Sequence, residues 1–209
     1  MSENTLRLRS KAAISVHHEC GLIEVFDCNN QPEGAFYIGG VFSVEVFDPE
    51  GKLKAKLNYV KNGVTSAALD HVLNVILRGI AAQSTWYVGL IASDSYTAFN
   101  SSDTMASHAG WIEFTNYTLG TRPQWSPDAP SSNSVSNSVS VDFVITGLSA
   151  TKTLQGIFLT SNSTKGGNTG STNFAAGLFA TALFTGGVTI NVNNGDTVRV
   201  TYTVSTQSG

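Results

Sequence analysis

Hydrophobic and polar positions follow a helical period in one segment of the chain, which begins at Thr65. Apolar residues recur there at spacings of three and four, so they share one face of a helix. That face consists of Leu69, Val72, Leu73, Ile76 and Ile80, with Val75 and Leu77 on its flanks. Thr65 or Ser66 can cap the first turn, and Gly79 suits the position after the last turn. The pattern predicts one helix over about 66–79, buried against a sheet through this wide apolar face, with His71 on its polar side.

The other segments mostly alternate between apolar and polar residues, which is the pattern of half-buried strands. Residues 41–48 and 52–59 alternate on either side of the turn sequence D-P-E-G and predict the clearest hairpin of the chain. Residues 85–92 are apolar on both faces, so we expect a central strand after the helix. In the second arm of the hairpin, the residues expected to point inward are Leu53, Ala55, Leu57 and Tyr59, and those expected to point outward are Lys52, Lys54 and Lys56.

The pattern as a whole predicts about nine to eleven strands and one helix. This is a mainly β fold, a β-sandwich with the helix packed on it. A length of 209 residues is compatible with one such domain. We assign residues 41–209 to the sandwich and residues 1–40 to an extended N-terminal arm followed by a hairpin. Residues 161–172, rich in Ser, Thr, Asn and Gly, are expected to form a flexible loop.

Composition narrows the classes of function. Charged residues are 13% of the chain, about half the usual share. The net charge of −3 provides no global basic field for nucleic acid, and no apolar run approaches the length of a membrane span. The first residues are polar and basic, so no signal peptide is expected. In a reducing cytoplasm Cys20 and Cys28 are expected as free thiols, with a local bridge as the alternative. Neither nucleic acid nor a membrane is an expected partner.

Residues of the types used in metal binding and nucleophilic catalysis occur without the spacing that builds a site. The sequence H-H-E-C at 17–20 is contiguous, whereas zinc ligands usually come as spaced pairs. Asp103 and His108 are close in the sequence, but no G-x-S-x-G elbow supplies an activated serine. The alternatives, a metal cluster and a catalytic histidine, therefore have little support compared with structural roles.

Glycan and phosphate chemistry have equally weak signals. The carboxylates available for glycan hydrolysis are Asp94, Asp103 and Glu113, and nothing in the sequence brings them together. Residues 164–171 contain glycines but lack the order of a phosphate-binding loop. Trp86, Trp111 and Trp125 suit either sugar stacking or core packing, and packing is the commoner use. We expect no catalytic residue, no metal site and no cofactor.

From Asp48 to Val204, roughly three-quarters of the chain resembles a recurring family of tailed-bacteriophage virion proteins. The matching segments include F-D-P-E-G-K-L-K, N-G-V-T-S-A-A-L-D-H-V-L, T-W-Y-V-G-L-I, T-R-P-Q-W, L-T-S-N-S-T-K-G-G-N-T-G and N-N-G-D-T-V-R-V-T-Y-T-V. The most distinctive block is D-T-M-A-S-H-A-G-W, which continues as I-E-F-T-N-Y. The resemblance implies a structural component of the particle and supplies no catalytic residues. The first 40 residues take no part in it.

Together these observations predict a non-enzymatic virion protein, assembled in the host cytoplasm. We expect a capsid decoration, or cement, protein that binds the major capsid protein and forms a homo-oligomer, a trimer or dimer. Its expected capsid contacts are Arg7, Arg9, Lys11, Lys52, Lys54 and Lys56. For the three residues of the hairpin, an ordinary solvated face is the alternative. For the protein as a whole, the alternative is a tail or fibre-associated protein that binds a host glycan, and a depolymerase is a third class.

Overall fold

The computed structural model describes residues 13–16, 23–26, 36–92, 96, 98–184 and 190–208, with the backbone alone for 13–16, 23–26, 36 and 208. These residues form fourteen strands and one α-helix, which confirms the mainly β fold. The strand count exceeds the predicted nine to eleven partly because β5, β7 and β8 have two residues each, too few to show an alternation. The arm expected over residues 1–12, together with Cys20 and Cys28, lies outside the described residues.

Two strands near the N-terminus form a hairpin of their own. β1 (Ala13–Val16) and β2 (Ile23–Phe26) pair antiparallel, with Ala13 opposite Phe26 and Val16 opposite Ile23. The chain divides into two compact units, one of residues 1–38 with 206–209 and one of residues 39–205. The larger unit contains the helix and the sandwich.

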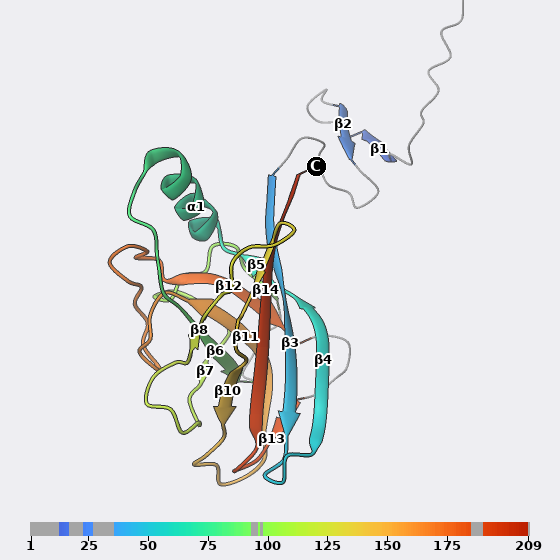
Figure 1. Ribbon diagram of the computed structural model, residues 1–209, viewed down its shortest axis with the longest axis vertical. Coiled ribbons are helices and arrows are strands. Elements are labelled where there is room, and N and C mark those ends of the chain that lie inside the picture. Colours follow the sequence, from blue (N-terminus) through green and yellow to red (C-terminus); the bar gives the residue numbers. More distant parts are fainter. Residues whose placement is uncertain are drawn as a thin grey trace, which may run out of the picture. The chain divides into compact units, whose positions relative to one another are not determined.

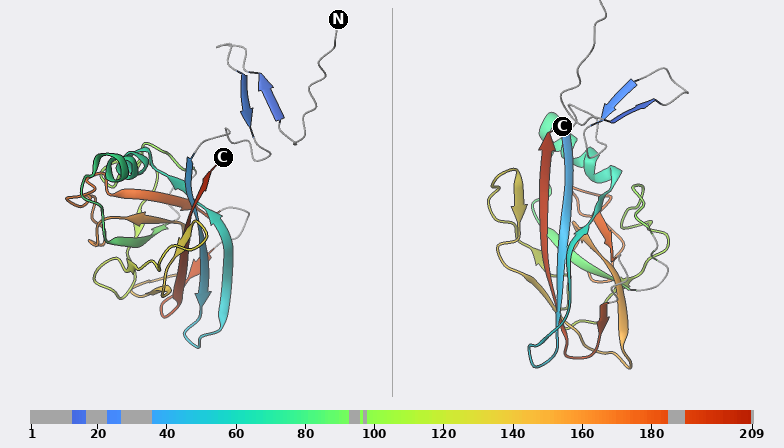
Figure 2. Two further views of the ribbon diagram at one scale, coloured as in Figure 1. Left: turned by 45° about the horizontal axis from the view of Figure 1, so that its top comes forward. Right: turned by 90° about the vertical axis from the view of Figure 1, so that its right-hand side faces the viewer.

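Two antiparallel sheets make up the sandwich (Figure 1, Figure 2). The first has the order β10-β14-β3-β4, with β9 also paired to β14. Its strands are β10 (Val141–Val144), β14 (Thr197–Ser208), β3 (Phe36–Phe47), β4 (Leu53–Lys61) and β9 (Ser134–Ser136). The second has the order β5-β12-β11-β6-β7, with β13 paired to β11 and β8 to β6. Its strands are β5 (Gly63–Val64), β12 (Leu178–Leu183), β11 (Lys152–Thr160), β6 (Trp86–Ala92), β7 (Glu113–Phe114), β13 (Ile190–Val192) and β8 (Gln124–Trp125).

Apolar side chains of both sheets are buried in the core. Alternate residues of β3 and β14 are fully buried, namely Phe42, Val44, Val46, Val198, Val200 and Tyr202. The rings of Phe42 and Tyr202 stack, with centroids 3.9 Å apart. β6 lies between β11 and β7 and is buried over residues 88–91, which confirms the predicted central strand. Gly89 is required there because a Cβ atom would lie 2.1 Å from Cζ of Phe158 on β11.

The predicted hairpin is present as β3 and β4, but the direction of two side chains in β4 was wrong. Phe42 pairs with Val60 and Val44 with Leu57, so β4 carries one residue more than β3 over this interval. The extra residue is accommodated at Tyr59, whose φ is 58° and whose side chain is 79% exposed. A β-bulge of this kind breaks the two-residue period on which the prediction depends. A second register shift near the start of β4 leaves Leu53 exposed as well.

The predicted helix is α1 (Ser66–Arg78). Thr65 caps it: its hydroxyl accepts a hydrogen bond from the backbone N–H of Ala68 at 3.2 Å and donates one to the carbonyl of Leu178 at 2.7 Å. Gly79 ends the helix in the left-handed conformation, with φ of 65°, a region that glycine adopts without steric cost. No helix of the described residues is long and apolar enough to cross a membrane.

The face through which α1 packs is the opposite of the predicted one. Ala68 and His71 are buried, and the helix contacts β12. The residues left exposed include those of the wide apolar face, namely Leu69, Leu73, Ile76, Leu77 and Ile80. α1 lies at the margin of the sandwich (Figure 1), so only one side of it can meet the sheet, and the apolar side chains named above are on the exposed side. The helix packs on the sandwich as predicted, but the prediction of the buried face was wrong: the apolar face is exposed and the side that carries His71 is buried.

Candidate functional site

The expected capsid-contact residues divide into three groups. Arg7, Arg9 and Lys11 lie outside the described residues. Lys54 and Lys56 form ion pairs within the chain, Lys54 with Asp196 and Lys56 with Glu45 at 2.8 Å. Lys52 is exposed in the turn before β4, and its side chain makes no hydrogen bond or ion pair with another described residue.

The two ion pairs have different consequences for binding. The Asp196 side chain is 2% exposed, and its carboxylate also accepts the backbone N–H of Asn193 at 2.7 Å. Lys54 therefore neutralises a buried charge, and exchanging this partner for one in another protein would leave Asp196 buried without its cation. The side chains of Lys56 and Glu45 are 45% and 28% exposed, and such surface pairs contribute about 0–1 kcal/mol. Lys56 can exchange its partner at little cost, so both Lys52 and Lys56 are exposed cations available to a partner.

Asp103 and His108, the candidates for acid–base chemistry, both hold Trp111 in place. The Asp103 carboxylate accepts a hydrogen bond from the indole nitrogen of Trp111 at 3.4 Å, and Asp103 is buried. The ring of His108 stacks on Trp111 with centroids 3.8 Å apart, and its Nδ1 lies 3.2 Å from the Trp111 carbonyl. Asp94 and the cluster at 17–20 lie outside the described residues. Within the described part of the chain, no three His, Cys, Asp or Glu side chains converge as metal ligands.

Glu113, the third carboxylate candidate, is bound in a buried ionic network that the sequence did not reveal. The Arg122 guanidinium donates to both carboxylate oxygens of Glu113, at 2.9 and 2.7 Å. It also donates to the carbonyls of Asn162 at 2.9 Å and Gly167 at 2.7 Å. Because the Glu113 carboxylate further accepts the backbone N–H of Gly166 at 2.8 Å, it is committed to structure and is not a free acid or base. The only hint in the sequence is a lone arginine in a charge-poor chain.

This network also explains why the loop at 161–172 is tied to the sandwich, where we predicted a flexible loop. The Lys165 ammonium donates to the carbonyls of Tyr117 at 3.0 Å and Leu119 at 2.6 Å. Inside the loop, the Asn162 side chain accepts from the backbone N–H of Thr164 at 2.7 Å and donates to the Thr169 hydroxyl at 2.8 Å. Composition alone could not show these bonds, because Asn and Ser serve equally in free and in hydrogen-bonded loops.

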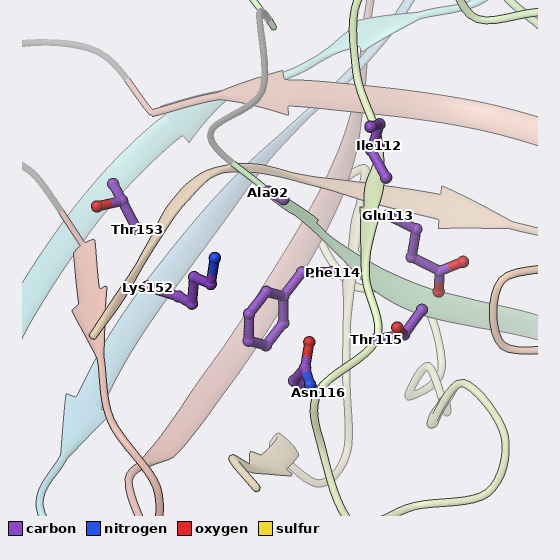
Figure 3. Close-up of a pocket in the computed structure, with 8 residues that line it drawn as sticks. All are labelled: Ala92, Ile112, Glu113, Phe114, Thr115, Asn116, Lys152 and Thr153. Atoms are coloured by element: carbon purple, nitrogen blue, oxygen red, sulfur yellow. The ribbon is translucent and has the colours of Figure 1, made fainter. Parts of the chain in front are cut away.

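A small pocket lies between β7 and the first residues of β11 (Figure 3). It is lined by Ala92, Ile112, Glu113, Phe114, Thr115, Asn116, Lys152 and Thr153, and its volume is about 200 Å³. Figure 3 shows the Phe114 ring and the Lys152 side chain on one side of the 112–116 segment and the Glu113 carboxylate on the other. Dedicated ligand sites usually measure about 300–1,000 Å³ and are mostly apolar, so this polar pocket is smaller than expected for one.

The three tryptophans serve packing. Trp111 and Trp125 are 3% and 5% exposed. Trp86 is half-buried, and its ring lies 5.0 Å from that of Phe179 and 5.9 Å from that of Phe174. These rings are therefore used inside the fold and do not form an exposed platform for sugars.

The apolar face of α1 is a candidate interaction surface, because five exposed large apolar side chains gather on it and just after it. Its five side chains are between 39% and 75% exposed, and they leave on the order of 500 Å² of apolar surface in water. The largest apolar patch on a protein is commonly about 300–600 Å² and is often functional. The signal in the sequence was the width of the apolar arc, because a helix at the margin of a sheet covers only one side. No family model matches the sequence, and no curated protein matches it.

Proposed function

We propose that this chain is a non-enzymatic structural protein of a tailed-bacteriophage virion. Its most specific role is that of a capsid decoration, or cement, protein that binds the major capsid protein and stabilises the assembled head. It assembles as a homo-oligomer in the host cytoplasm and remains in the virion. The virion assignment rests on the resemblance carried by D-T-M-A-S-H-A-G-W and the other matching segments.

The observation that carries the role in assembly is the exposed apolar face of α1. Isolated exposed apolar side chains are ordinary, but Leu69, Leu73, Ile76 and Leu77 form one contiguous face on a helix. A contiguous exposed apolar face of this kind often serves as an interaction site.

The contacts of the acidic and histidine candidates support a role without catalysis. Glu113 is held by Arg122 and Gly166, and Asp103 and His108 are held against Trp111. General acid–base catalysis needs a group that is free to exchange a proton with a substrate. In the described part of the chain, these three candidates are instead engaged by structural partners.

Attachment to the head is expected to use Arg7, Arg9 and Lys11 of the arm together with Lys52 and Lys56. The last two lie on the same edge of the first sheet and are exposed. Lys54, although it belongs to the same set in the sequence, is expected to contribute through the Asp196 pair that stabilises the fold. An acidic region of the major capsid protein is the complementary partner.

The test is the copy number of the protein on purified phage particles. Wild type is expected at a copy number comparable with that of the major capsid protein. Deletion of residues 1–12 and the substitution Lys52→Glu are each expected to lower the copy number, because both remove positive charge from the contact. Lys152→Glu is the matched control, since Lys152 is also an exposed lysine but belongs to β11 in the other sheet.

The other outcomes identify the other classes. A handful of copies per particle with measurable affinity for a host glycan would replace the cement role by the tail or fibre role, and loss of that affinity in Lys152→Glu would place the glycan in the pocket of Figure 3. Release of reducing ends from host polysaccharide would identify a depolymerase. Unchanged copy number in both the deletion and Lys52→Glu would sink the proposed mode of attachment.

A further inference from the structure

The apolar face of α1 has a pattern that matches itself when the helix is reversed. Leu69, Leu73 and Ile76 are separated by four and three residues, the spacing of the inward positions of a coiled coil. Reversal about a point between Asn74 and Val75 exchanges Leu73 with Ile76, Val72 with Leu77, and Leu69 with Ile80. Each of the five exposed apolar positions of this face therefore maps onto an apolar position.

Such a pattern fits one partner in particular, a second copy of the same face. In a two-fold interface the same patch is used by both subunits, so the patch must be self-complementary. At the margin of the face, next to Leu77 on the helix, lies the exposed Asp70. An apolar centre with a polar rim is the usual anatomy of a protein interface.

We propose that α1 pairs antiparallel with α1 of a second copy of this chain, about a two-fold axis that passes near Asn74 and Val75. Leu73 then packs against the partner's Ile76 at the centre of the interface. This inference rests on the assembly role proposed above and adds its surface, its geometry and its order, a dimer.

The exposed apolar area of α1 and the fact that the helix is already formed both favour this pairing. An interface of standard size buries about 800 Å² on each partner, and the apolar face supplies more than half of that before its rim is counted. An isolated helix of 13 residues is marginal in water because its nucleation is unfavourable. α1 is already capped by Thr65 and packed on β12, so pairing requires no helix formation.

The first experiment measures the mass of the purified full chain by sedimentation and light scattering from about 1 to 100 μM. Wild type is expected to be a dimer. Ile76→Glu places a carboxylate in the seam of each copy and is expected to raise the dissociation constant by more than roughly 100-fold. Ile112→Glu is the matched control, because Ile112 is 60% exposed against 65% for Ile76 and lies outside α1. It is expected to remain a dimer.

A mixing experiment tests the antiparallel arrangement. Leu73→Lys alone is expected to be monomeric, as is Ile76→Glu. When the two variants are mixed, the carboxylate introduced at position 76 of one chain faces the ammonium introduced at position 73 of the other, and the remaining Leu73 faces the remaining Ile76. The mixture is therefore expected to form a 1:1 heterodimer. A parallel pair would place the introduced carboxylate against Ile76 and the introduced ammonium against Leu73, so it would not be rescued.

Three results would overturn the proposal: a monomeric wild type over the whole concentration range, a dimer that persists in Ile76→Glu, or a mixture that stays monomeric while both variants remain folded by circular dichroism. These measurements involve no phage particle. Loss of head attachment with an intact dimer would count against the capsid role alone, and a monomer that still decorates the head would count against α1 pairing alone.

Discussion

Arg122 is the largest fully buried side chain among the described residues, in a chain with few charges. Its guanidinium bonds Glu113 through two nitrogens and two loop carbonyls besides, and it lies 5.3 Å from the ring centroid of Phe158. This one residue joins β7 to the loop at 161–172. A buried charge is tolerated only when it is fully paired, so removing Arg122 or one of its partners leaves the others buried and unsatisfied.

Arg122→Ala is expected to lower the free energy of unfolding by about 3–5 kcal/mol, because it leaves the Glu113 carboxylate buried without its cation. Arg122→Lys keeps the charge but not the two-nitrogen geometry, so an intermediate loss is expected. Urea unfolding of the purified chain measures both.

Arg199→Ala is the control for this comparison. Arg199 also bonds a carboxylate through two nitrogens, that of Asp142, but the two side chains are 42% and 36% exposed. An exposed pair of this kind contributes about 0–1 kcal/mol. Equal losses in Arg122→Ala and Arg199→Ala would contradict the role given to burial.

At the residue scale, the sequence predicts less than at larger scales. Lys54 is exposed, as expected of an outward residue, but its ion pair could not be predicted because its partner, Asp196, lies 142 positions away in the chain. The inward direction expected for Tyr59 failed because a bulge depends on the register with β3, which no property of β4 alone determines. The absence of a catalytic constellation remains a prediction.

At the scale of elements, α1 shows that local sequence determines where a helix begins and ends, whereas tertiary packing determines which of its faces is covered. Its beginning and its end follow from local chemistry: the cap was predicted at Thr65 or Ser66 and is Thr65, and the predicted end at Gly79 is confirmed. The covered face was not, because an apolar stripe tells which side avoids water and does not tell whose atoms cover it. The central position of β6 was predictable for the opposite reason, since a strand that is apolar on both faces has to be covered twice.

Thr65→Val is expected to destabilise the protein by about 2 kcal/mol. The substitution keeps the shape of the side chain but removes an acceptor for the Ala68 N–H and a donor to the Leu178 carbonyl, both buried. Thr65→Ser retains the hydroxyl and loses one methyl group, so the expected loss is below about 1 kcal/mol. Thermal unfolding followed by circular dichroism compares the two, and a Ser variant as unstable as the Val variant would refute the capping role.

At the scale of the whole molecule, the fold is completed by packing between the two sheets and by packing against the buried side of α1. The two sheets cover one another, and aromatic pairs such as Phe42 with Tyr202 fill the space within. The segment after α1 and the loop before β12 meet the helix around His71, whose Nε2 accepts the backbone N–H of Gln83 at 3.3 Å and whose ring centroid is 4.9 Å from that of Phe174. This contact holds the helix from its buried side and fixes the ring proton on Nδ1.

Because burial lowers the pKa of His71 below its ordinary value of about 6.5, the stability of the molecule is expected to depend on pH. The unfolded chain then binds more protons than the folded one, so the neutral ring contributes fully above pH of about 6.5 and less as the pH falls toward the folded-state pKa. His71→Gln removes the titrating group while keeping an acceptor. Between pH of about 7.5 and 5, wild type is expected to lose more unfolding free energy than the variant. Parallel curves would show that His71 is not the group responsible.

The bulge at Tyr59 affects how copies of the protein can associate at high local concentration. β4 is the last strand of its sheet, so the backbone of one side has no partner within that sheet. An open edge of this kind can pair with a strand of a neighbouring chain, and at high local concentration repeated pairing leads to fibres. The two register shifts in β4 interrupt the regular row of donors and acceptors that an added strand would need. Copies packed side by side are therefore expected to meet through side chains and not through a shared sheet.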